Sequence, residues 1–186
     1  LVVRSASALV EDQQTGQHLF QKQAEAVLPI ASITKLMTAM VVLDAQTDLQ
    51  EMITIESEDV DILRHSGSRL PVGTRLMREE ALLLALMASE NRSAHALGRT
   101  HPGGLGAFTA AMNAKAAALG LTDTRFAEPT GLSSGNVSSA RDLARMVDAA
   151  YRYPLVREFT TREEATIRSG RRTLEFRNIN RLIWNH

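Results

Sequence analysis

The sequence predicts an α+β domain, and three observations lead to that fold class. Strand-like segments lie at both ends of the chain, in residues 1–20 and 165–176. Between them lie several segments in which apolar residues recur at helical spacing. No internal repeat or low-complexity linker divides the chain. We therefore expect the terminal strands to share one sheet and the central helices to form a second lobe.

The first part of the chain predicts a hairpin followed by a buried helix. Residues 1–9 are rich in valine and resemble a strand, residues 11–16 form a turn cluster, and residues 17–20 resemble a return strand. A short loop, residues 22–29, leads to a helix that we expect to be largely buried. The apolar residues at helical spacing in it are Ile33, Leu36, Met37, Met40 and Val41.

The central part of the chain predicts helices that are separated by clear breaks. Residues 52–55 are a short strand candidate, and residues 66–73 are irregular. Gly120 is placed to end a helix, and residues 124–127 resemble a short extended piece before a turn. Helices are expected over residues 79–87, 92–99 and 105–119.

The last part of the chain predicts two helices and a second hairpin. Residues 139–151 resemble a helix with Ser138 or Ser139 as its N-cap. A short helix is expected next, over residues 154–160. The final hairpin is expected to pair residues 165–168 with residues 173–176.

Composition excludes several functional classes. The 186 residues carry 21 Lys and Arg against 21 Asp and Glu, and this zero formal net charge argues against a nucleic-acid partner. The chain has no cysteine, which excludes disulfides, zinc–thiolate sites and a cysteine nucleophile. None of the histidines has the spacing of a helical zinc site, so we expect no metal or other cofactor. The most apolar run, residues 81–88, is too short to span a membrane.

Ser32 and Lys35 are the first candidates for reactive chemistry. They lie three residues apart at the start of a predicted helix, which puts both side chains on one face. A hydroxyl beside an amine can act as nucleophile and base when the amine is neutral, and burial near a helix N-terminus lowers the pKa of a lysine. From these two residues alone, an N-cap role for Ser32 is the more common explanation. A capping box, however, has Glu or Gln where this chain has Lys35.

Ser89 and Asn91 are the second candidates, because they lie at the junction of two predicted helices. Side chains at such a junction can point into a cleft. The hydroxyl of Ser89 could relay a proton, and the amide of Asn91 could hold the lysine amine or a substrate carbonyl. Taken alone, both residues are explained as well by a plain helix end followed by an N-cap.

Together, Ser32-x-x-Lys35 and Ser89-x-Asn91 resemble the first two signatures of the serine penicillin-binding proteins and β-lactamases. The surrounding sequence resembles the low-molecular-mass D-alanyl-D-alanine peptidases, above all their endopeptidase branch, the penicillin-binding protein seven type. The resemblance extends over nearly the whole chain. The segments that carry it are residues 29–40, 84–92, 112–116, 129–133 and 178–182.

The resemblance implies a fold like that of serine β-lactamases and penicillin-binding proteins, with helices packed on an antiparallel sheet and a mainly helical lobe. We expect residues 1–186 to form a single incomplete domain of this kind. Residues 1–45 and 139–186 would lie in the sheet-containing lobe, and residues 46–138 in the mainly helical lobe.

The resemblance also implies a periplasmic hydrolase that cleaves D-alanyl peptide bonds in peptidoglycan through an acyl-enzyme. Ser32 would be the nucleophile and would supply one oxyanion-hole amide, and Lys35 would be its general base. Ser89 would relay a proton towards the leaving amine. Asn91 would position Lys35 and the substrate amide. Peptidoglycan peptides would be the partners, and β-lactams would acylate the same serine.

One family motif is missing from this sequence. The family has Lys-Thr-Gly or Lys-Ser-Gly on a strand that lines the cleft, soon after the position of Trp184. The only lysines here are Lys22, Lys35 and Lys115, and none precedes Thr-Gly or Ser-Gly. We therefore expect a fragment of a longer protein that lacks the last strands of the sheet and is inactive by itself. The chain also opens without a methionine or a signal peptide, as a processed or trimmed chain would.

Three alternatives stay open at the level of sequence. The protein could be a D-alanyl-D-alanine carboxypeptidase, or a non-catalytic relative that lacks Lys-Thr-Gly and only binds wall peptides. It could also be a β-lactamase. The sequence argues against this last possibility, because it has no Glu-x-x-Leu-Asn segment and Glu128 stands in a different context, before Pro129.

Overall fold

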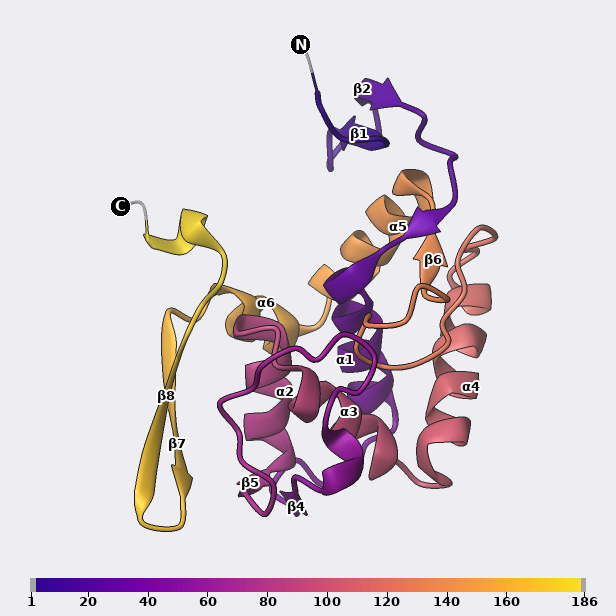
Figure 1. Cartoon of the computed structure of the whole chain (residues 1–186). Helices are drawn as coiled ribbons and strands as arrows, with labels where there is room; N and C mark the ends of the chain where they lie inside the picture. Colours follow the sequence, from indigo (N-terminus) through magenta and orange to yellow (C-terminus); the bar gives the residue numbers. More distant parts are fainter. Residues whose placement is uncertain (1–2, 185–186) are drawn as a thin grey trace.

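The structure is a computed structural model that describes residues 3–184 (Figure 1). Residues 1–2, which begin the first predicted strand, lie outside the described residues. Figure 1 shows α1 in the middle of the helices, with α4 on one side and α2 on the other. The helices are α1 (Thr34–Asp44), α2 (Arg78–Met87), α3 (Asn91–Arg99), α4 (Gly104–Ala118), α5 (Ala140–Tyr151) and α6 (Pro154–Thr161).

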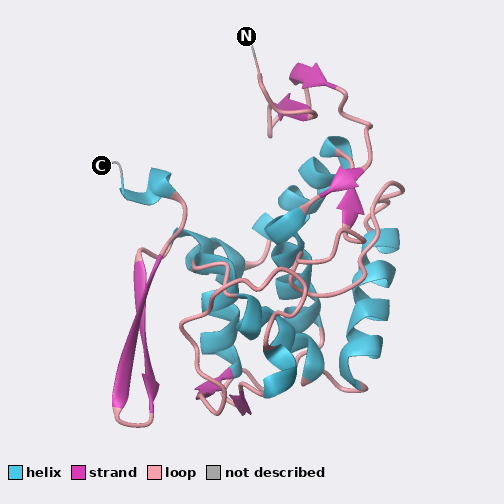
Figure 2. Cartoon of the chain, viewed as in Figure 1, coloured by secondary structure: helices cyan, strands magenta, loops and turns pink. Residues whose placement is uncertain are grey.

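The described strands form four antiparallel pairs, each of two strands (Figure 2). Short 3₁₀ turns also occur, at Ala31–Ile33, Ser57–Asp59 and Arg181–Trp184. The strand pairs are β1 (Ala8–Glu11) with β2 (His18–Lys22), β3 (Leu28–Pro29) with β6 (Val137–Ser138), β4 (Met52–Thr54) with β5 (Arg75–Met77), and β7 (Glu164–Ser169) with β8 (Arg172–Arg177).

The expectation that the terminal strands share one sheet is wrong for the described residues. The hairpins β1–β2 and β7–β8 are separate sheets. They also lie on different parts of the helical body, since β1 contacts α5 whereas β7 contacts α2 and β5. No described strand connects them, so each hairpin forms strand-to-strand hydrogen bonds only within itself. The carbonyl of Glu175 on β8 also accepts from the guanidinium of Arg69 at 2.9 Å.

The first strand also differs from its prediction, because it runs from Ala8 to Glu11 rather than over residues 1–9. Lys22 explains the difference. Its Nζ donates hydrogen bonds to the carbonyl oxygens of Val3 (3.0 Å) and Ser5 (2.8 Å), which hold these backbone groups away from a strand partner. Pairing of β1 with β2 begins only at Ala8, opposite Lys22.

The helices agree with the sequence to within a residue or two at each end. Ser139 is the N-cap of α5, because its hydroxyl accepts a hydrogen bond from the amide of Asp142 at 3.2 Å. Gly120 adopts a positive φ of 69° just after α4, as expected for a residue that ends a helix. Both helix boundaries were therefore set by local sequence.

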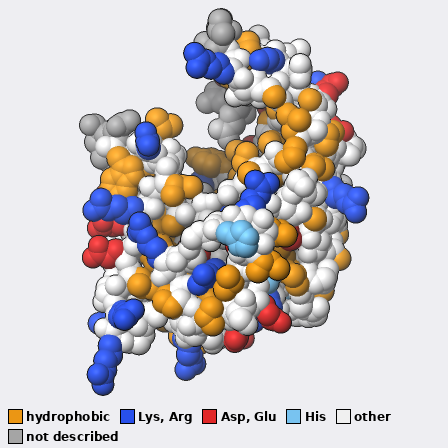
Figure 3. Space-filling model, viewed as in Figure 1, with side chains coloured by type: hydrophobic (Ala, Val, Ile, Leu, Met, Phe, Trp, Pro, Cys, Tyr) orange, Lys and Arg blue, Asp and Glu red, His pale blue; other side chains and the backbone are white. Residues whose placement is uncertain are grey.

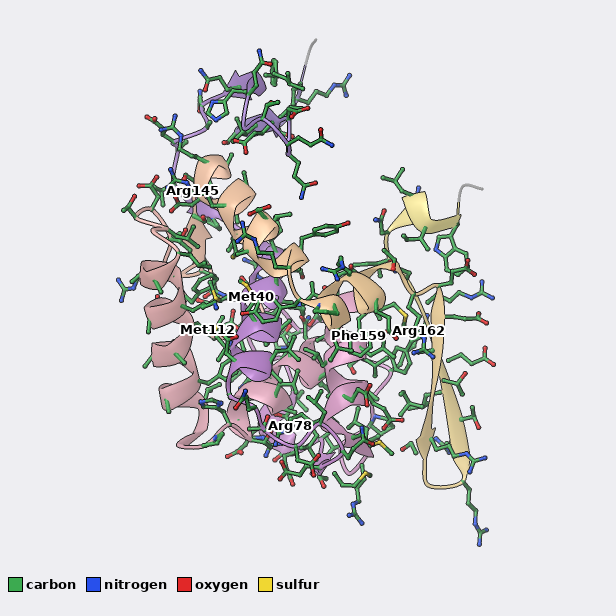
Figure 4. The ribbon with its side chains drawn as sticks, turned by 180° about the vertical axis from the view of Figure 1, so that it is seen from behind. Met40, Arg78, Met112, Arg145, Phe159 and Arg162 are labelled. Atoms are coloured by element: carbon green, nitrogen blue, oxygen red, sulfur yellow. The ribbon has the colours of Figure 1, made fainter. Side chains whose placement is uncertain are left out.

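The core is built around α1, which is buried as predicted. Eight of its eleven residues are buried, including Met37 and Met40. Figure 4 shows Met40 of α1 and Met112 of α4 between these two helices, and both side chains have no exposed surface. This packing holds the N-terminal end of α1 in a fixed position against its neighbours.

Large apolar side chains remain exposed on and beside the two hairpins, where Figure 3 shows hydrophobic atoms at the surface. Leu19 on β2 and Leu182 after β8 are 61% and 77% exposed. The β7–β8 hairpin nevertheless places Ala165, Ile167 and Phe176 in the core, whereas β1 and β2 have no buried residue. The assignment of residues 1–45 and 139–186 to one lobe, and of residues 46–138 to another, stays a prediction.

Candidate active site

Ser32 lies in the 3₁₀ turn Ala31–Ile33, immediately before α1 begins at Thr34. The N-cap positions of the turn and of α1 are Ile30 and Ile33, and neither helix has a side-chain cap. The N-cap explanation of Ser32 is therefore wrong. Its side chain is exposed, and its Oγ accepts a hydrogen bond from the Nζ of Lys35 at 3.2 Å.

The turn that carries Ser32 has an unusual backbone. Ala31 has a φ of +48°, in the left-handed region that residues with a Cβ seldom adopt. Gly131 packs directly against this turn, because a Cβ added to it would lie 1.9 Å from the carbonyl oxygen of Ala31. Strained backbone of this kind concentrates at functional sites, where the surrounding structure holds it in place.

Lys35 is buried, with 3% of its surface exposed, and its Nζ has three acceptors. These are Oγ of Ser32 at 3.2 Å, Oδ1 of Asn91 at 2.8 Å and the carbonyl oxygen of Thr130 at 2.7 Å. Burial lowers the pKa of Lys35 to about 8, although the carboxylates of Glu128 and Glu90 act in the opposite direction. A sizeable fraction of this amine is therefore neutral near pH 8 and able to accept a proton.

Asn91 is the first residue of α3, and its amide is oriented by a chain of hydrogen bonds. Nδ2 of Asn91 donates to Oγ of Ser66 at 2.9 Å, and Ser66 Oγ donates to Oδ2 of Asp61 at 2.6 Å. An ionised carboxylate can only accept, so the Ser66 hydroxyl must donate to Asp61 and accept from Asn91. This polarity turns Oδ1 of Asn91 towards Lys35.

Asp61 is held in its charged form by the loop around it. Desolvation acts to raise its pKa, but hydrogen bonds from Ser66, Arg64 and Leu63 outweigh it, and the pKa lies well below the usual range. The carboxylate is therefore available as an acceptor for Ser66 at any pH at which Lys35 titrates. This fixes the direction of the whole chain of hydrogen bonds.

Ser89 lies between α2 and α3, at the predicted junction, and has a positive φ of 53°. Its side chain is partly exposed. No hydrogen bond joins its hydroxyl to Ser32, Lys35 or Asn91 within residues 3–184. The structure thus brings Ser32, Lys35 and Asn91 into direct contact and leaves the Ser89 hydroxyl outside their hydrogen bonds.

The sequence indicated residues 129–133 only as a turn and as part of the resemblance, with no role in the site. In the structure, the segment of residues 128–136 contacts α1 through three hydrogen bonds, one of them the bond to Lys35 described above. The carbonyl of Thr130 accepts from Lys35, that of Pro129 accepts from Thr38 Oγ1 at 2.7 Å, and Asn136 Nδ2 donates to Thr34 Oγ1 at 3.0 Å. The Pro-Thr-Gly turn marked this segment as a bend. Two of its three contacts use backbone carbonyls, which carry no signal in the side-chain sequence.

Other features of the described chain do not compete with this cluster. A groove of about 1190 Å³ lies between the β1–β2 hairpin and α5, lined by residues such as Leu9, Leu143 and Tyr153. None of the four predicted site residues lines it. Residues 3–184 contain no group of three or more acidic or histidine side chains arranged to hold a metal ion. Within the same residues, no helix is both long and apolar enough to cross a membrane.

Comparison with known proteins agrees with the geometry. The family model described as D-alanyl-D-alanine carboxypeptidase, peptidase S11, matches residues 2–186. A D-alanyl-D-alanine endopeptidase of Pseudomonas aeruginosa is 52% identical over 183 residues, which are 97% of this chain and 59% of that protein. One of Escherichia coli K12 is 46% identical over 184 residues, or 98% of this chain and 59% of the relative. The chain thus spans about three fifths of the length of these two relatives.

Solved structures show the same fold. The Streptomyces K15 DD-transpeptidase matches with a TM-score of 0.90 at 25% identity, covering 98% of this chain and 76% of that one. A D-alanyl-D-alanine carboxypeptidase of Mycobacterium tuberculosis matches with a TM-score of 0.84 at 27% identity, covering 97% and 69%. These matches confirm the penicillin-binding-protein-like α+β fold. Since the family model extends over residues 2–186 and the relatives agree with it, this chain belongs to the peptidase S11 family of D-alanyl-D-alanine carboxypeptidases.

Proposed function

We propose that the full-length protein is a serine D-alanyl-D-alanine endopeptidase that cleaves cross-links of peptidoglycan through an acyl-enzyme on Ser32. The observation that carries the proposal is the contact of Lys35 with Ser32. A buried amine with a pKa of about 8 lies 3.2 Å from an exposed hydroxyl. Both relatives described above are named D-alanyl-D-alanine endopeptidases, which favours this specificity over carboxypeptidase activity.

In the first half of the reaction, the neutral amine of Lys35 accepts the proton of the Ser32 hydroxyl while Oγ attacks the D-alanyl carbonyl carbon. The carbonyl π electrons move onto oxygen, and the backbone amide of Ser32 donates one hydrogen bond to this oxyanion. Asn91 keeps the amine in place, because its Oδ1 accepts from Nζ at 2.8 Å.

Collapse of the tetrahedral intermediate breaks the C–N bond and releases the amine, which takes up the proton that Lys35 accepted from Ser32. We assign the relay of this proton to Ser89, whose partly exposed hydroxyl has no hydrogen bond to Ser32, Lys35 or Asn91. Water then attacks the ester on Ser32, and Lys35 accepts its proton. The C–Oγ bond breaks, and Oγ takes this proton back from Lys35. The products are the free D-alanyl carboxylate and the regenerated serine.

The proposal includes the periplasm as the compartment and β-lactams as covalent inhibitors. A β-lactam carbonyl would be attacked by the same Oγ, and its ring nitrogen would be the leaving group. Because the sequence has no Glu-x-x-Leu-Asn segment of the kind that carries the deacylating glutamate of a β-lactamase, we expect the acyl-enzyme to be long-lived. This outcome would distinguish the protein from a β-lactamase.

The test uses the full-length protein and a fluorescent penicillin. The wild type should gain a long-lived label, and mass spectrometry of its peptides should place the adduct on Ser32. Ser32→Ala should abolish the label, whereas Ser57→Ala, which changes an exposed serine, should keep it. Release of cross-linked dimers to monomers, without loss of the terminal D-alanine from pentapeptides, would establish the endopeptidase specificity. Label that survives Ser32→Ala would refute the proposal.

A further inference from the structure

The segment of residues 128–136 reaches both reactive groups of the site. Its Thr130 carbonyl accepts a hydrogen bond from Lys35 Nζ at 2.7 Å, and Thr130 itself is only 3% exposed. The next residue, Gly131, touches the turn of the nucleophile. A Cβ on Gly131 would lie 1.9 Å from the carbonyl oxygen of Ala31 and 2.9 Å from the amide nitrogen of Ser32. Two consecutive residues therefore contact the proposed base and the proposed oxyanion amide.

One carboxylate organises this pair of residues. Oε2 of Glu128 accepts hydrogen bonds from the backbone amide of Thr130 at 2.6 Å and from its hydroxyl. Oε1 accepts from the amide of Gly131 at 2.7 Å, from Asn136 Nδ2 at 2.9 Å and from the amide of Ser133 at 3.3 Å. Five donors thus converge on a single side chain, and two of them are the backbone amides of the two residues that touch the site.

Other hydrogen bonds also hold this segment, since Thr38 donates to the carbonyl of Pro129 and Asn136 donates to Thr34. Glu128 differs from them in accepting from the amides of both Thr130 and Gly131. Gly131 needs a φ of +89°, which carries no steric preference in glycine and must be imposed by its surroundings. The hydrogen bonds from Thr130 and Gly131 to one carboxylate impose it, because both amides must point at the same two oxygens. Hydrogen bonds to a charged acceptor are stronger than those between neutral groups.

We propose that Glu128 is a positioning residue of this site, whose carboxylate holds Thr130 against Lys35 and Gly131 against the peptide bond between Ala31 and Ser32. This inference rests on the proposed function, in which Lys35 is the base and Ser32 the nucleophile. Glu128 acts through the backbone of the segment and not by contact with the substrate. The same carboxylate places a negative charge close enough to Lys35 to stabilise its ammonium form.

The negative charge of Glu128 affects the pKa of Lys35, an effect that a purely structural role of the loop would not produce. Burial lowers the pKa of Lys35, and two carboxylates oppose it, Glu128 from this segment and Glu90 from the N-cap of α3. Removal of the Glu128 charge takes away one opposing interaction, so the pKa of Lys35 should fall further. The neutral amine then forms at lower pH, and the acid limb of the acylation profile should move in that direction.

The first variant is Glu128→Gln, which keeps the size of the side chain. Its amide nitrogen cannot accept hydrogen bonds, so either the two donors to Oε2 or the three donors to Oε1 lose their acceptor, and the charge disappears. In full-length protein, we expect the limiting rate of penicillin acylation to fall by about tenfold or more. We also expect the acid limb to shift to lower pH. Glu175→Gln removes the same charge from an exposed residue on β8 and should change neither quantity.

The second variant, Glu128→Asp, keeps the charge but shortens its reach. It should lower the acylation rate and leave the midpoint of the pH profile near that of the wild type. An acylation rate equal to that of the wild type in this variant would overturn the positioning role, even if Glu128→Gln failed to fold.

A direct titration of Lys35 keeps this inference separate from the proposed function. Full-length protein with ¹³C-labelled lysine reports the pKa of Lys35 by NMR, and Lys35→Met assigns the signal. Glu128→Gln should lower that pKa, and Glu175→Gln should not. An unchanged pKa in Glu128→Gln overturns the inference whether or not penicillin acylates the protein. Failure of the wild type to react with penicillin would refute only the function.

Discussion

Lys35 is held from two sides that are built in different ways. On one side, the segment of residues 128–136 uses the backbone carbonyl of Thr130 and packs Gly131 against the turn of Ser32. On the other side, α3 uses a side chain, the amide of Asn91, which is oriented through Ser66 and Asp61. On the first side Thr130 and Gly131 are buried, whereas on the second side Ser66 and Asp61 are partly exposed.

This difference predicts which substitutions should change the acylation rate with little change in the free energy of unfolding. The contacts of Thr130 and Gly131 are made by backbone atoms, so they depend on the backbone conformation of a segment that packs against the core. Changes there should therefore lower the free energy of unfolding and the acylation rate together. The side-chain relay ends at a partly exposed loop, so changes in it should affect the orientation of Asn91 with little effect on folding.

The largest effect is expected where both sides meet, at Lys35 itself. Lys35→Met fills the same buried space without an amine, so acylation should fall by about 10²–10⁴-fold, the usual contribution of a general base. In the wild type, acylation should rise with pH through about 8, because the ammonium must lose its proton before it can accept one. Stopped-flow measurement of penicillin acylation between pH 6 and 10 tests both points, with Lys22→Met as the control.

The same substitution has a stability consequence whose sign follows from linkage. Between about pH 8 and the ordinary lysine value of 10.5, the unfolded chain binds more protons than the folded one. The free energy of unfolding of the wild type should therefore rise with pH in that window, relative to Lys35→Met. A constant difference between the two proteins across this window would contradict the lowered pKa.

A smaller loss of acylation rate is expected from Gly131→Ala, which disturbs the contact between the segment of residues 128–136 and the turn of Ser32. The left-handed φ of +89° alone costs an alanine roughly 1–2 kcal/mol. The new Cβ must also displace the carbonyl of Ala31, and with it the amide of Ser32, so we expect acylation to fall by about 10²-fold, as for a lost oxyanion donor. Urea unfolding and penicillin acylation measure the two effects.

The turn between β7 and β8 contains a glycine that serves as a matched control for Gly131→Ala. Gly170 also has a positive φ, of 60°, but a Cβ on it would have no neighbour within 4 Å. Gly170→Ala should therefore lose a similar amount of stability from backbone strain and retain its acylation rate. Equal acylation rates in Gly131→Ala and Gly170→Ala would show that the contact with Ala31 does not matter for the site.

The two sides of Lys35 were also unequal in how far the sequence predicted them. Helical spacing placed Ser32 and Lys35 near each other, because helices have a strong periodic signal, whereas the proximity of Asn91 to Lys35 was implied only by the family resemblance. The N-terminal strand was misplaced, since the hydrogen bonds from Lys22 to the carbonyls of Val3 and Ser5 are not encoded in any strand pattern. The pairing of both hairpins into one sheet was wrong because strand order depends on long-range contacts.

Within the site, the sequence indicated the partners Ser32, Lys35 and Asn91 but not the groups that orient them. Glu128 was noticed only because it does not match the deacylating glutamate of a β-lactamase. Its five hydrogen-bond donors converge only when residues 130–136 fold back upon it. Asp61 and Ser66 carried no signal either, since a hydrogen-bond relay across 25 residues from Ser66 to Asn91 has no characteristic spacing.

The smallest effect is expected from Ser66→Ala, which breaks the exposed side alone. It removes the acceptor of Asn91 Nδ2 and the donor to Asp61, so the amide of Asn91 is free to turn its NH₂ group towards Lys35. We expect acylation to fall by about tenfold, equivalent to about 1.4 kcal/mol. The free energy of unfolding should fall by about 1 kcal/mol, or about 0.5 kcal/mol for each of the two lost, partly exposed hydrogen bonds. Ser57→Ala is the control on an exposed serine. If Ser66→Ala lost as much stability and as much acylation as Gly131→Ala, the proposed difference between the two sides of Lys35 would be refuted.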